Sequence, residues 1–335
     1  MLRPGITIPL EPFHNRHLVE LVHRAEELGY TDAWSAESFT TDAFSPLTAV
    51  AAVTKKMRLG TAIVPVFTRP PALIAMSSAT VQLLSEGRFI LGLGISTKTI
   101  VQRWMGVPFE KQVTRLKETV QALRAAFSRE KVNLDGKTVK IDGFRLDLPM
   151  QTPPPIYISA QGTQMLQLAG EIGDGLITNF VTPQALPAML KQVHDAARTA
   201  GKDPAKFDVV ARIIVAVDED ADDAREVLRR SLTPYVTSPQ YNKFFREYGF
   251  DQEAAEIIAA WDAGDRKKAL ELIPDRMVES IFVFGTADQC RKRLDQFAAA
   301  GVKTSALMIT SLAKTPEERR AKIMRAIEAL APSGR

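Results

Sequence analysis

The segment 155–180 constrains the fold of this chain more than any other. It reads PIYISAQGTQMLQLAGEIGDGLITNF, in which a short β-branched run, 156–158, ends in small residues. A helical pattern with apolar residues on one face follows over 163–172, and a second apolar run occupies 176–178. This order predicts a β-α-β unit, whose two strands lie parallel in one sheet.

Small and polar residues stand where the first strand of this unit gives way to its helix. Ser159, Ala160, Gln161 and Gly162 come before Thr163, the first residue of the helical pattern. The first N–H groups of a helix have no partner within the helix, and its dipole is positive at that end. An anion is therefore favoured there, and the turn predicts a binding site for the phosphate of a cofactor.

Strand-like and helix-like segments alternate along the whole chain. The expected strands are Ile6–Pro9, Asp32–Ser35, Leu59–Val64, Phe89–Gly94, Ile156–Ala160, Gly175–Asn179, Val209–Val217 and Ser305–Ile309. The expected helices are 14–29, 71–84, 112–127, 163–172, 187–200 and 221–232, and two late ones that begin with capping boxes at Thr286 and Thr315.

Eight parallel strands are the number that closes a barrel, so we expect an α/β fold of the (β/α)8 TIM-barrel type. A doubly wound open sheet would require a Gly-rich turn after the first strand, and residues 10–14 contain none. Two segments interrupt the alternation. Residues 131–155, after the fourth helix, predict a hairpin, and residues 233–278, after the seventh strand, predict helices that form either a lid over the barrel or additional packing. The whole chain, 1–335, is expected to be one domain.

Composition excludes several classes of function. The formal charge is +4, and lysine and arginine are dispersed among acidic residues, so we expect no nucleic-acid partner. No apolar run approaches about 18 residues and the N-terminus does not resemble a signal peptide, which predicts a cytoplasmic protein without membrane association. Cys290 is the only cysteine, so thiolate metal sites and internal disulfides are excluded.

The residues at the expected strand ends indicate a cofactor enzyme. We find no serine or cysteine paired with a histidine and no metal-binding cluster, and therefore expect a bound organic cofactor to carry the reaction. Several positions remain open to two interpretations. Glu37 is either functional or a solvated loop carboxylate, Arg212 is either functional or a salt-bridged strand residue, and His14 lies near the mouth or at a surface helix start.

Three segments of the sequence resemble a known family of enzymes. The segment 60–94, GTAIVPVFTRPPALIAMSSATVQLLSEGRFILGLG, resembles the bacterial-luciferase-like flavin and deazaflavin oxidoreductases. The run DAWSAES at 32–38 and the segment 156–179 agree with that family in order and spacing. The resemblance is especially close to the branch that uses coenzyme F420, which includes methylenetetrahydromethanopterin reductase. It implies a (β/α)8 barrel, usually a homodimer, with the cofactor and a small-molecule substrate at the C-terminal mouth.

The resemblance also implies site residues by position. The cofactor phosphate would meet the amides of Ala160, Gln161 and Gly162, with Ser159 and Thr163 adjacent. A non-proline cis peptide between Ala62 and Ile63 would form a bulge behind the deazaflavin ring. The other expected cofactor-binding residues are Ser35, Thr61, Gly94, Ser96, Thr97 and Asn179.

One position departs from part of the family. Members that oxidise alcohols or sugar phosphates carry Asp-His where this chain has Glu37-Ser38, and that histidine serves the substrate's proton. We therefore expect reduced F420 to transfer hydride to a small unsaturated substrate of the enone or imine type, with Glu37 as catalytic proton donor. The alternatives are an FMN-dependent monooxygenase and a non-catalytic flavin- or deazaflavin-binding protein.

Overall fold

The computed structural model describes residues 2–13, 16–38, 40–218, 220–311 and 313–332. Its strands are β1 (Arg3–Ile8), β2 (Asp32–Ser35), β3 (Arg58–Thr61), β4 (Val64–Pro65), β5 (Phe89–Gly94), β6 (Val132–Asp135), β7 (Lys140–Phe144), β8 (Ile156–Ser159), β9 (Gly175–Asn179), β10 (Asp208–Val217), β11 (Val283–Gly285) and β12 (Thr304–Ile309).

Eight of the strands within these described ranges are parallel and close into a barrel. Their order around the barrel is β1, β2, β3, β5, β8, β9, β10, β12, and β12 pairs with β1 again. The short β4 pairs with β5 beyond the end of β3, and β11 pairs with the last residues of β10. The predicted (β/α)8 barrel is confirmed, and each predicted strand has its counterpart.

Helices surround the barrel. They are α1 (Arg16–Glu27), α2 (Phe44–Ala51), α3 (Pro71–Leu84), α4 (Gln112–Phe127), α5 (Thr163–Ile172), α6 (Leu186–Thr199), α7 (Ala221–Val236), α8 (Pro239–Phe245), α9 (Asp251–Asp262), α10 (Arg266–Glu271), α11 (Asp275–Ile281), α12 (Ala287–Ala299) and α13 (Pro316–Ala329), with the π-helices η1 (Thr99–Trp104) and η3 (Arg246–Phe250) and the 3-10 turn η2 (Pro204–Lys206). None of the helices in the described part of the chain combines the length and the apolar character needed to cross a membrane.

The two predicted capping boxes are present. In α12 the hydroxyl of Thr286 accepts from the backbone N–H of Gln289, while the side chain of Gln289 accepts from the backbone N–H of Thr286. Thr315 and Glu318 make the same reciprocal pair at α13. Each box satisfies N–H groups that the helix itself leaves unpaired, which fixes where these helices begin.

Charged side chains close the N-terminal end of the barrel. Asp208, at the start of β10, accepts from Arg3 at 2.5 Å and from Arg58 at 3.1 Å, and the hydroxyl of Tyr157 donates to it at 3.0 Å. Arg58 also pairs with the fully buried Asp32 at 2.5 Å. The network therefore joins the first residues of β1, β2, β3 and β10 and reaches β8 through Tyr157.

Apolar side chains fill the barrel above this network. Trp34, from β2, is fully buried there with Tyr157, Ile177 and Val210. A Cβ on residue 60 would lie 2.2 Å from the Trp34 ring, so Gly60 is what leaves room for the indole. This packed layer makes the lower barrel solid and leaves its C-terminal end for a site.

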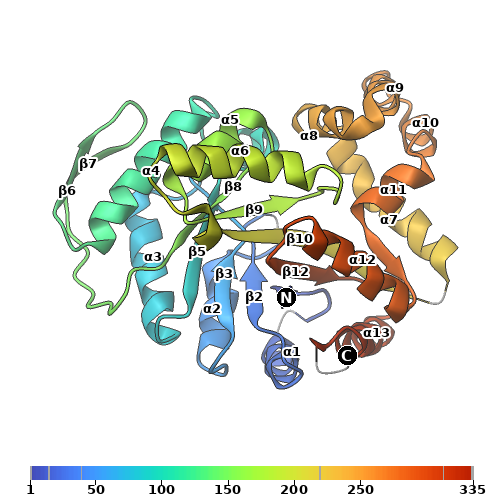
Figure 1. Ribbon diagram of the computed structural model, residues 1–335, viewed down its shortest axis with the longest axis horizontal. Helices are drawn as coiled ribbons and strands as arrows, with labels where there is room; N and C mark the ends of the chain where they lie inside the picture. Colours follow the sequence, from blue (N-terminus) through green and yellow to red (C-terminus); the bar gives the residue numbers. More distant parts are fainter. Residues whose placement is uncertain (1, 14–15, 39, 219, 312, 333–335) are drawn as a thin grey trace.

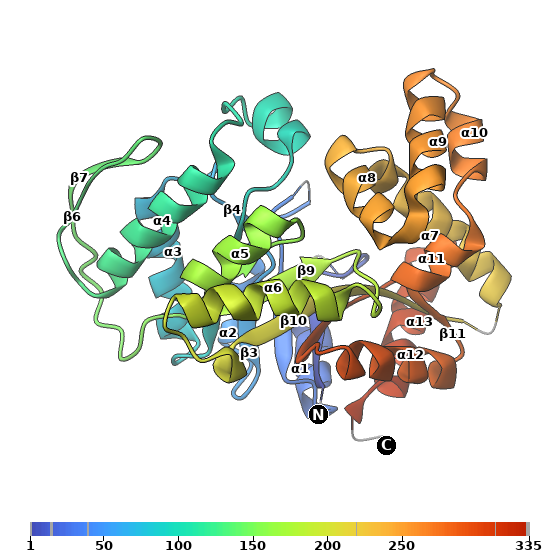
Figure 2. The same cartoon turned by 45° about the horizontal axis from the view of Figure 1, so that its top comes forward.

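The two insertions lie at opposite ends of the molecule (Figures 1 and 2). The predicted hairpin in 131–155 is the antiparallel pair β6–β7. The predicted helical insertion 233–278 contains the end of α7 together with α8, η3, α9, α10 and the start of α11. Its apolar side chains, such as Phe245, Ile257 and Met277, form a buried cluster separate from the main barrel core.

Replacing Asp208 by asparagine should destabilise the protein by about 3 kcal/mol, because Arg3 and Arg58 would lose their shared carboxylate. Burial by itself would raise the pKa of Asp208, but the two arginines hold that pKa below its ordinary value of 3.8. The stabilisation from this carboxylate is therefore present at neutral pH and is lost as the pH falls through its folded-state pKa.

Urea denaturation should accordingly show a difference in the free energy of unfolding between the wild type and Asp208→Asn at pH 7, and this difference should become smaller below about pH 4. Asp135→Asn is the control, because Asp135 forms an ion pair with Lys140 in which both side chains are largely exposed. A difference that grows on acidification would contradict the assigned role of Asp208.

Candidate active site

A cavity of about 420 Å³ opens at the C-terminal end of the barrel strands. The segments that follow β1, β2, β3, β5, β8 and β9 line it, together with side chains from β10, β12 and α8. Most of the predicted site residues meet here: Glu37, Ala62, Ile63, Gly94, Ser96, Thr97, Ser159, Ala160, Gln161, Gly162 and Asn179. Its size and its mixture of apolar and polar walls are typical of a small-molecule site.

A bulge forms one wall of the cavity. The peptide bond between Ala62 and Ile63 is cis, as predicted, and it separates β3 from β4, which the sequence pattern had joined as one strand. The Ala62 amide donates to the carbonyl of Ser35 at 2.6 Å, and the Glu37 amide donates to the carbonyl of Ile63 at 3.1 Å. A Cβ on Gly94 would lie 3.1 Å from the Ile63 side chain and 3.2 Å from the Cβ of Ser159. Glycine at position 94 therefore lets Ile63 and Ser159 pack closely against β5.

The turn between β8 and α5 has an uncapped helix N-terminus. Gly162 is the N-cap of α5, and no side chain caps the helix there. The Ala160 amide, which we expected to meet a phosphate, instead donates to the carbonyl of Ile177 at 3.2 Å within the sheet. The expected contact through the Ala160 amide is therefore wrong, although the residue lines the cavity. The N–H groups of the first turn of α5, from Thr163 onward, have no partner within the helix and no side-chain cap.

Three predicted residues do not line the cavity. Thr61 is fully buried, and its hydroxyl donates to the carbonyl of Gly92 at 2.9 Å and accepts from the Gly92 amide at 2.8 Å, so it joins β3 to β5. Ser35 is the register partner of Thr61 and lies fully buried beneath the bulge, which its carbonyl holds. Thr163 is exposed on α5. Its backbone remains part of the helix N-terminus, but its side chain does not face the cavity.

Glu37 lines the cavity as a restrained carboxylate. It forms a salt bridge of 2.7 Å with Arg69 and accepts from the hydroxyl of Thr68 at 3.0 Å. Only 11% of the Glu37 side chain and 19% of the Arg69 side chain are exposed, so solvent screens this pair little. Both carboxylate oxygens of Glu37 are thus engaged by neighbouring side chains. These contacts favour a positioning role over the predicted proton donation.

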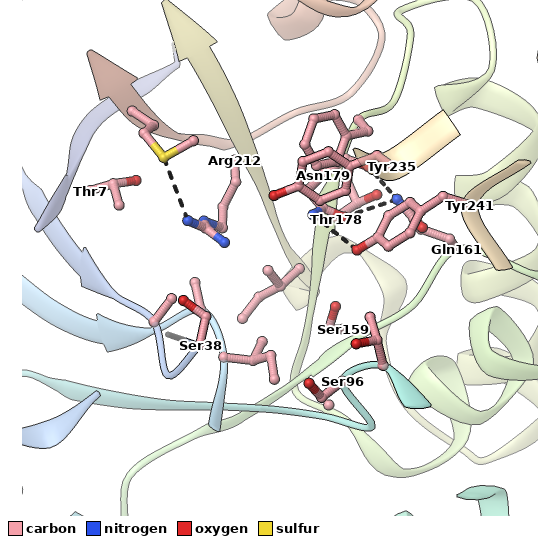
Figure 3. A pocket seen from close by; sticks show the side chains of 18 of the residues that line it. Thr7, Ser38, Ser96, Ser159, Gln161, Thr178, Asn179, Arg212, Tyr235 and Tyr241 are labelled. Atoms are coloured by element: carbon pink, nitrogen blue, oxygen red, sulfur yellow. Dashed lines mark hydrogen bonds between the residues drawn. The ribbon is translucent and has the colours of Figure 1, made fainter. Parts of the chain in front are cut away.

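Aromatic residues from the helical insertion form the opposite wall, which the sequence pattern did not assign to the site. Phe180 packs against Tyr235 of α7 and Tyr241 of α8, with ring centroids 4.0 and 5.8 Å away. Asn179 donates to the hydroxyl of Tyr241 at 3.5 Å, and Gln161 donates to Asn179 (Figure 3). These bonds connect the β8–α5 turn to the insertion, so the insertion does form part of the site.

Two cavity residues have left-handed backbone conformations. Ser96 has a φ of 63° and Phe180 a φ of 48°, and neither is glycine. Such conformations cost about 1–3 kcal/mol each and tend to gather at ligand sites, where the surrounding structure holds them. Here they direct the chain after β5 and after β9 around the cavity rim.

The site has polar donors but no imidazole or metal cluster in its described part. Burial raises the pKa of Tyr241, so its phenol stays protonated at neutral pH. No histidine is among the described residues that line the cavity, and His14 lies outside the described residues. The described residues also contain no group of histidine, cysteine and acidic side chains able to hold a metal ion.

The comparisons with known proteins agree with this geometry. The family model of luciferase-like monooxygenases matches residues 3–304. The chain belongs to this family. The family resemblance in the sequence is thereby confirmed. The cavity described above lies at the C-terminal end of the barrel, which is where the resemblance implied a site.

Relatives within the luciferase-like family include F420-dependent enzymes. A 5,10-methylenetetrahydromethanopterin reductase of Methanolobus tindarius is 31% identical over 281 residues, which cover 83% of this chain and 85% of the relative. The solved structure of the coenzyme F420-dependent tetrahydromethanopterin reductase from Methanopyrus kandleri matches with a TM-score of 0.79 at 25% identity, covering 99% of this chain and 97% of that one. An F420-dependent secondary alcohol dehydrogenase in complex with an F420–acetone adduct matches with a TM-score of 0.81 at 22% identity, covering 100% and 99%, and supports the fold alone.

If Arg69 restrains Glu37, the two residues should be energetically coupled. A double-mutant cycle of Glu37→Gln and Arg69→Met, measured by urea denaturation, should give a coupling free energy of about 1–3 kcal/mol. The exposed pair Lys140 and Asp135 is the control, with an expected coupling below about 1 kcal/mol. A coupling near zero for Glu37 and Arg69 would return Glu37 to the list of candidate proton donors.

Proposed function

We propose that this protein is a coenzyme F420-dependent oxidoreductase that transfers hydride between reduced deazaflavin and a small unsaturated organic substrate. The observation that carries this proposal is one cavity that combines the Ala62–Ile63 bulge with the open N-terminus of α5. The F420-dependent relatives, one at 31% identity, support the choice of cofactor.

The residues of the cavity fit such a cofactor. Ala62 and Ile63 of the bulge offer an apolar wall for a ring system, and the N–H groups at the start of α5 suit a phosphate. When bound, the deazaflavin supplies the carbon that gives or takes a hydride. The chain's own part is to hold the substrate beside that ring and to keep water away with Ile63, Ile95 and Phe244.

The side chains of the site support reduction rather than alcohol oxidation. Removal of a proton from a substrate hydroxyl needs a base, and the described cavity lining has no histidine to provide one. Glu37 is occupied by Arg69 and Thr68. An enone or imine accepts hydride at carbon and takes the balancing proton from solvent, while the hydroxyl and amide groups of the cavity can donate a hydrogen bond to its heteroatom.

An FMN-dependent monooxygenase is the second candidate, because the family as a whole is described as luciferase-like monooxygenases. Binding without turnover is the third. Titration of the purified protein with F420 and with FMN, followed by fluorescence, separates the first two. Oxidation of the reduced cofactor only when an unsaturated substrate is present separates the first from the third.

A side chain at position 94 should weaken F420 binding. Gly94→Ala should lower the affinity and Gly94→Val should lower it further, by about tenfold or more, because each added carbon would press on Ile63 and Ser159 and displace that wall of the cavity. Gly201→Ala is the control. Gly201 has a φ of +74° in an open surface turn, so a side chain there should affect stability without affecting affinity. Unchanged F420 binding in Gly94→Val would contradict the proposed placement of the ring.

We also propose that two copies of the chain associate through the outer face of α3. That face carries exposed apolar side chains over three turns: Leu73, Met76, Leu83 and Leu84, each 38–49% exposed. Such a row on a surface helix is typical of an interface, and a second copy offers the same row in a two-fold arrangement.

Light scattering should therefore report a dimer for the wild type and a monomer for Leu84→Glu, because a carboxylate in an apolar interface would lose its hydration. Val227→Glu, at an exposed apolar position on α7, is the matched control and should leave the dimer intact. A monomeric wild type at micromolar concentration would contradict this proposal.

A further inference from the structure

Arg212 is a half-buried cation for which the site described so far has no use. It lies within β10, where it is in register with Asn179 of β9 and Ala306 of β12. Its guanidinium reaches into the cavity and makes one long contact, 3.9 Å to the Sδ of Met308, and its Nε is buried without a hydrogen-bond partner (Figure 3). Burial lowers the pKa of Arg212, but a guanidinium remains charged in proteins.

The carboxylates of the cavity do not neutralise this charge. Among the described residues that line the cavity, the acidic ones are Glu11 and Glu37. Glu11 pairs with Arg319 at 2.5 Å, and Glu37 pairs with Arg69 at 2.7 Å. Both carboxylates are thus paired with other arginines, and neither pairs with Arg212.

The guanidinium of Arg212 therefore lacks an acceptor. An unpaired guanidinium that faces a cavity destabilises the fold unless a ligand supplies the missing acceptor. The acceptor that suits it best carries negative charge and two oxygens.

The cofactor phosphate does not meet this need. The phosphate site is the N-terminus of α5, next to Ser159, and Figure 3 places Arg212 away from Ser159 and Ser96 on the other side of the cavity. The two anion sites are therefore separate, one at the helix and one at the barrel wall.

We infer that Arg212 binds a carboxylate of the substrate, so that the enzyme acts on a small unsaturated carboxylic acid. The type of reaction in this inference rests on the proposed function, whereas the negative charge of the substrate is inferred from Arg212 alone. The planar guanidinium matches a carboxylate through two parallel hydrogen bonds, which fixes the orientation of the substrate as well as its affinity.

The test compares two probes of equal size, crotonate and crotonamide, which differ in charge. Calorimetry of the wild type saturated with oxidised F420 should show crotonate binding at least about tenfold more tightly than crotonamide. Arg212→Met should remove that preference and leave crotonamide and F420 binding unchanged. Arg212→Lys, which keeps the charge without the planar fork, should retain part of it. Arg145→Met, which removes an exposed positive charge in the 131–155 segment, is the matched control and should behave like the wild type.

Thermal unfolding of the unliganded protein gives an independent readout. A structural arginine would lower the melting temperature when replaced, whereas an unpaired charge should leave it equal or higher in Arg212→Met. A lower melting temperature in that variant, equal affinity of the wild type for both probes, or crotonate binding that survives in Arg212→Met would each overturn the inference. An equal loss of F420 affinity in Arg212→Met would overturn it too, because the arginine would then serve the cofactor ring.

Failure of the proposed function leaves a different signature. If F420 does not bind the wild type, calorimetry of the unloaded protein still measures whether crotonate binding depends on Arg212. Loss of that dependence and loss of F420 binding are thus separate results.

Discussion

The ionic network at the N-terminal end of the barrel is the interaction on which the rest of the structure depends. Asp208, Asp32, Arg3 and Arg58 bring together the first residues of four strands that are far apart in the sequence. A barrel closes only when its first and last strands meet in one register, and a buried carboxylate shared by two arginines is satisfied in one arrangement of those strands. The charges therefore select the register, while the apolar core between the barrel and its helices supplies most of the burial.

Closure at one end leaves the other end available for chemistry. Because the lower barrel is filled, the residues at the carboxyl ends of the strands need not contribute to the core, and several carry polar or strained features instead. Ser96 and Phe180 have left-handed conformations, and Arg212 and Thr178 have unpaired polar atoms. These local departures from stable structure lie at one cavity, which is the pattern expected of a binding site whose ligand completes it.

Much of the architecture is legible in the sequence because its signals are local. Apolar runs of four to six residues between amphipathic helices marked the barrel strands, and capping boxes marked α12 and α13. Elements with weak local signals were not predicted. β11 has three residues, and α2 is apolar with a proline near its start, so neither gave a clear period. The first strand begins at Arg3 rather than Ile6 because its pairing with β12 and its salt bridge, not its apolar content, extend it.

The site was less predictable than the fold, because it is formed by residues that are far apart in the sequence. Residues that follow strand ends could be assigned to the mouth, but the depth of each side chain could not. Ser35 and Thr61 stand one layer below the residues that line the cavity, where their groups hold the barrel together. Tyr235 and Tyr241 come from an insertion whose placement over the barrel no local pattern reveals. The sequence left the role of Arg212 open, because that role follows from its lack of hydrogen-bond partners. Whether an arginine on β10 has partners depends on β9, β12 and the insertion together, and no local pattern shows their arrangement.

The helical insertion has its own buried cluster, distinct from the barrel core, yet it supplies one wall of the cavity. Packing errors in α8 to α10 are thus confined to that cluster and leave strand pairing untouched. A lineage that inherits such an arrangement can accumulate changes in the insertion, and so explore new substrates, while the barrel beneath continues to fold and to hold the same redox partner. The division between the barrel core and a separately packed cavity wall would make this chain a tolerant starting point for directed evolution.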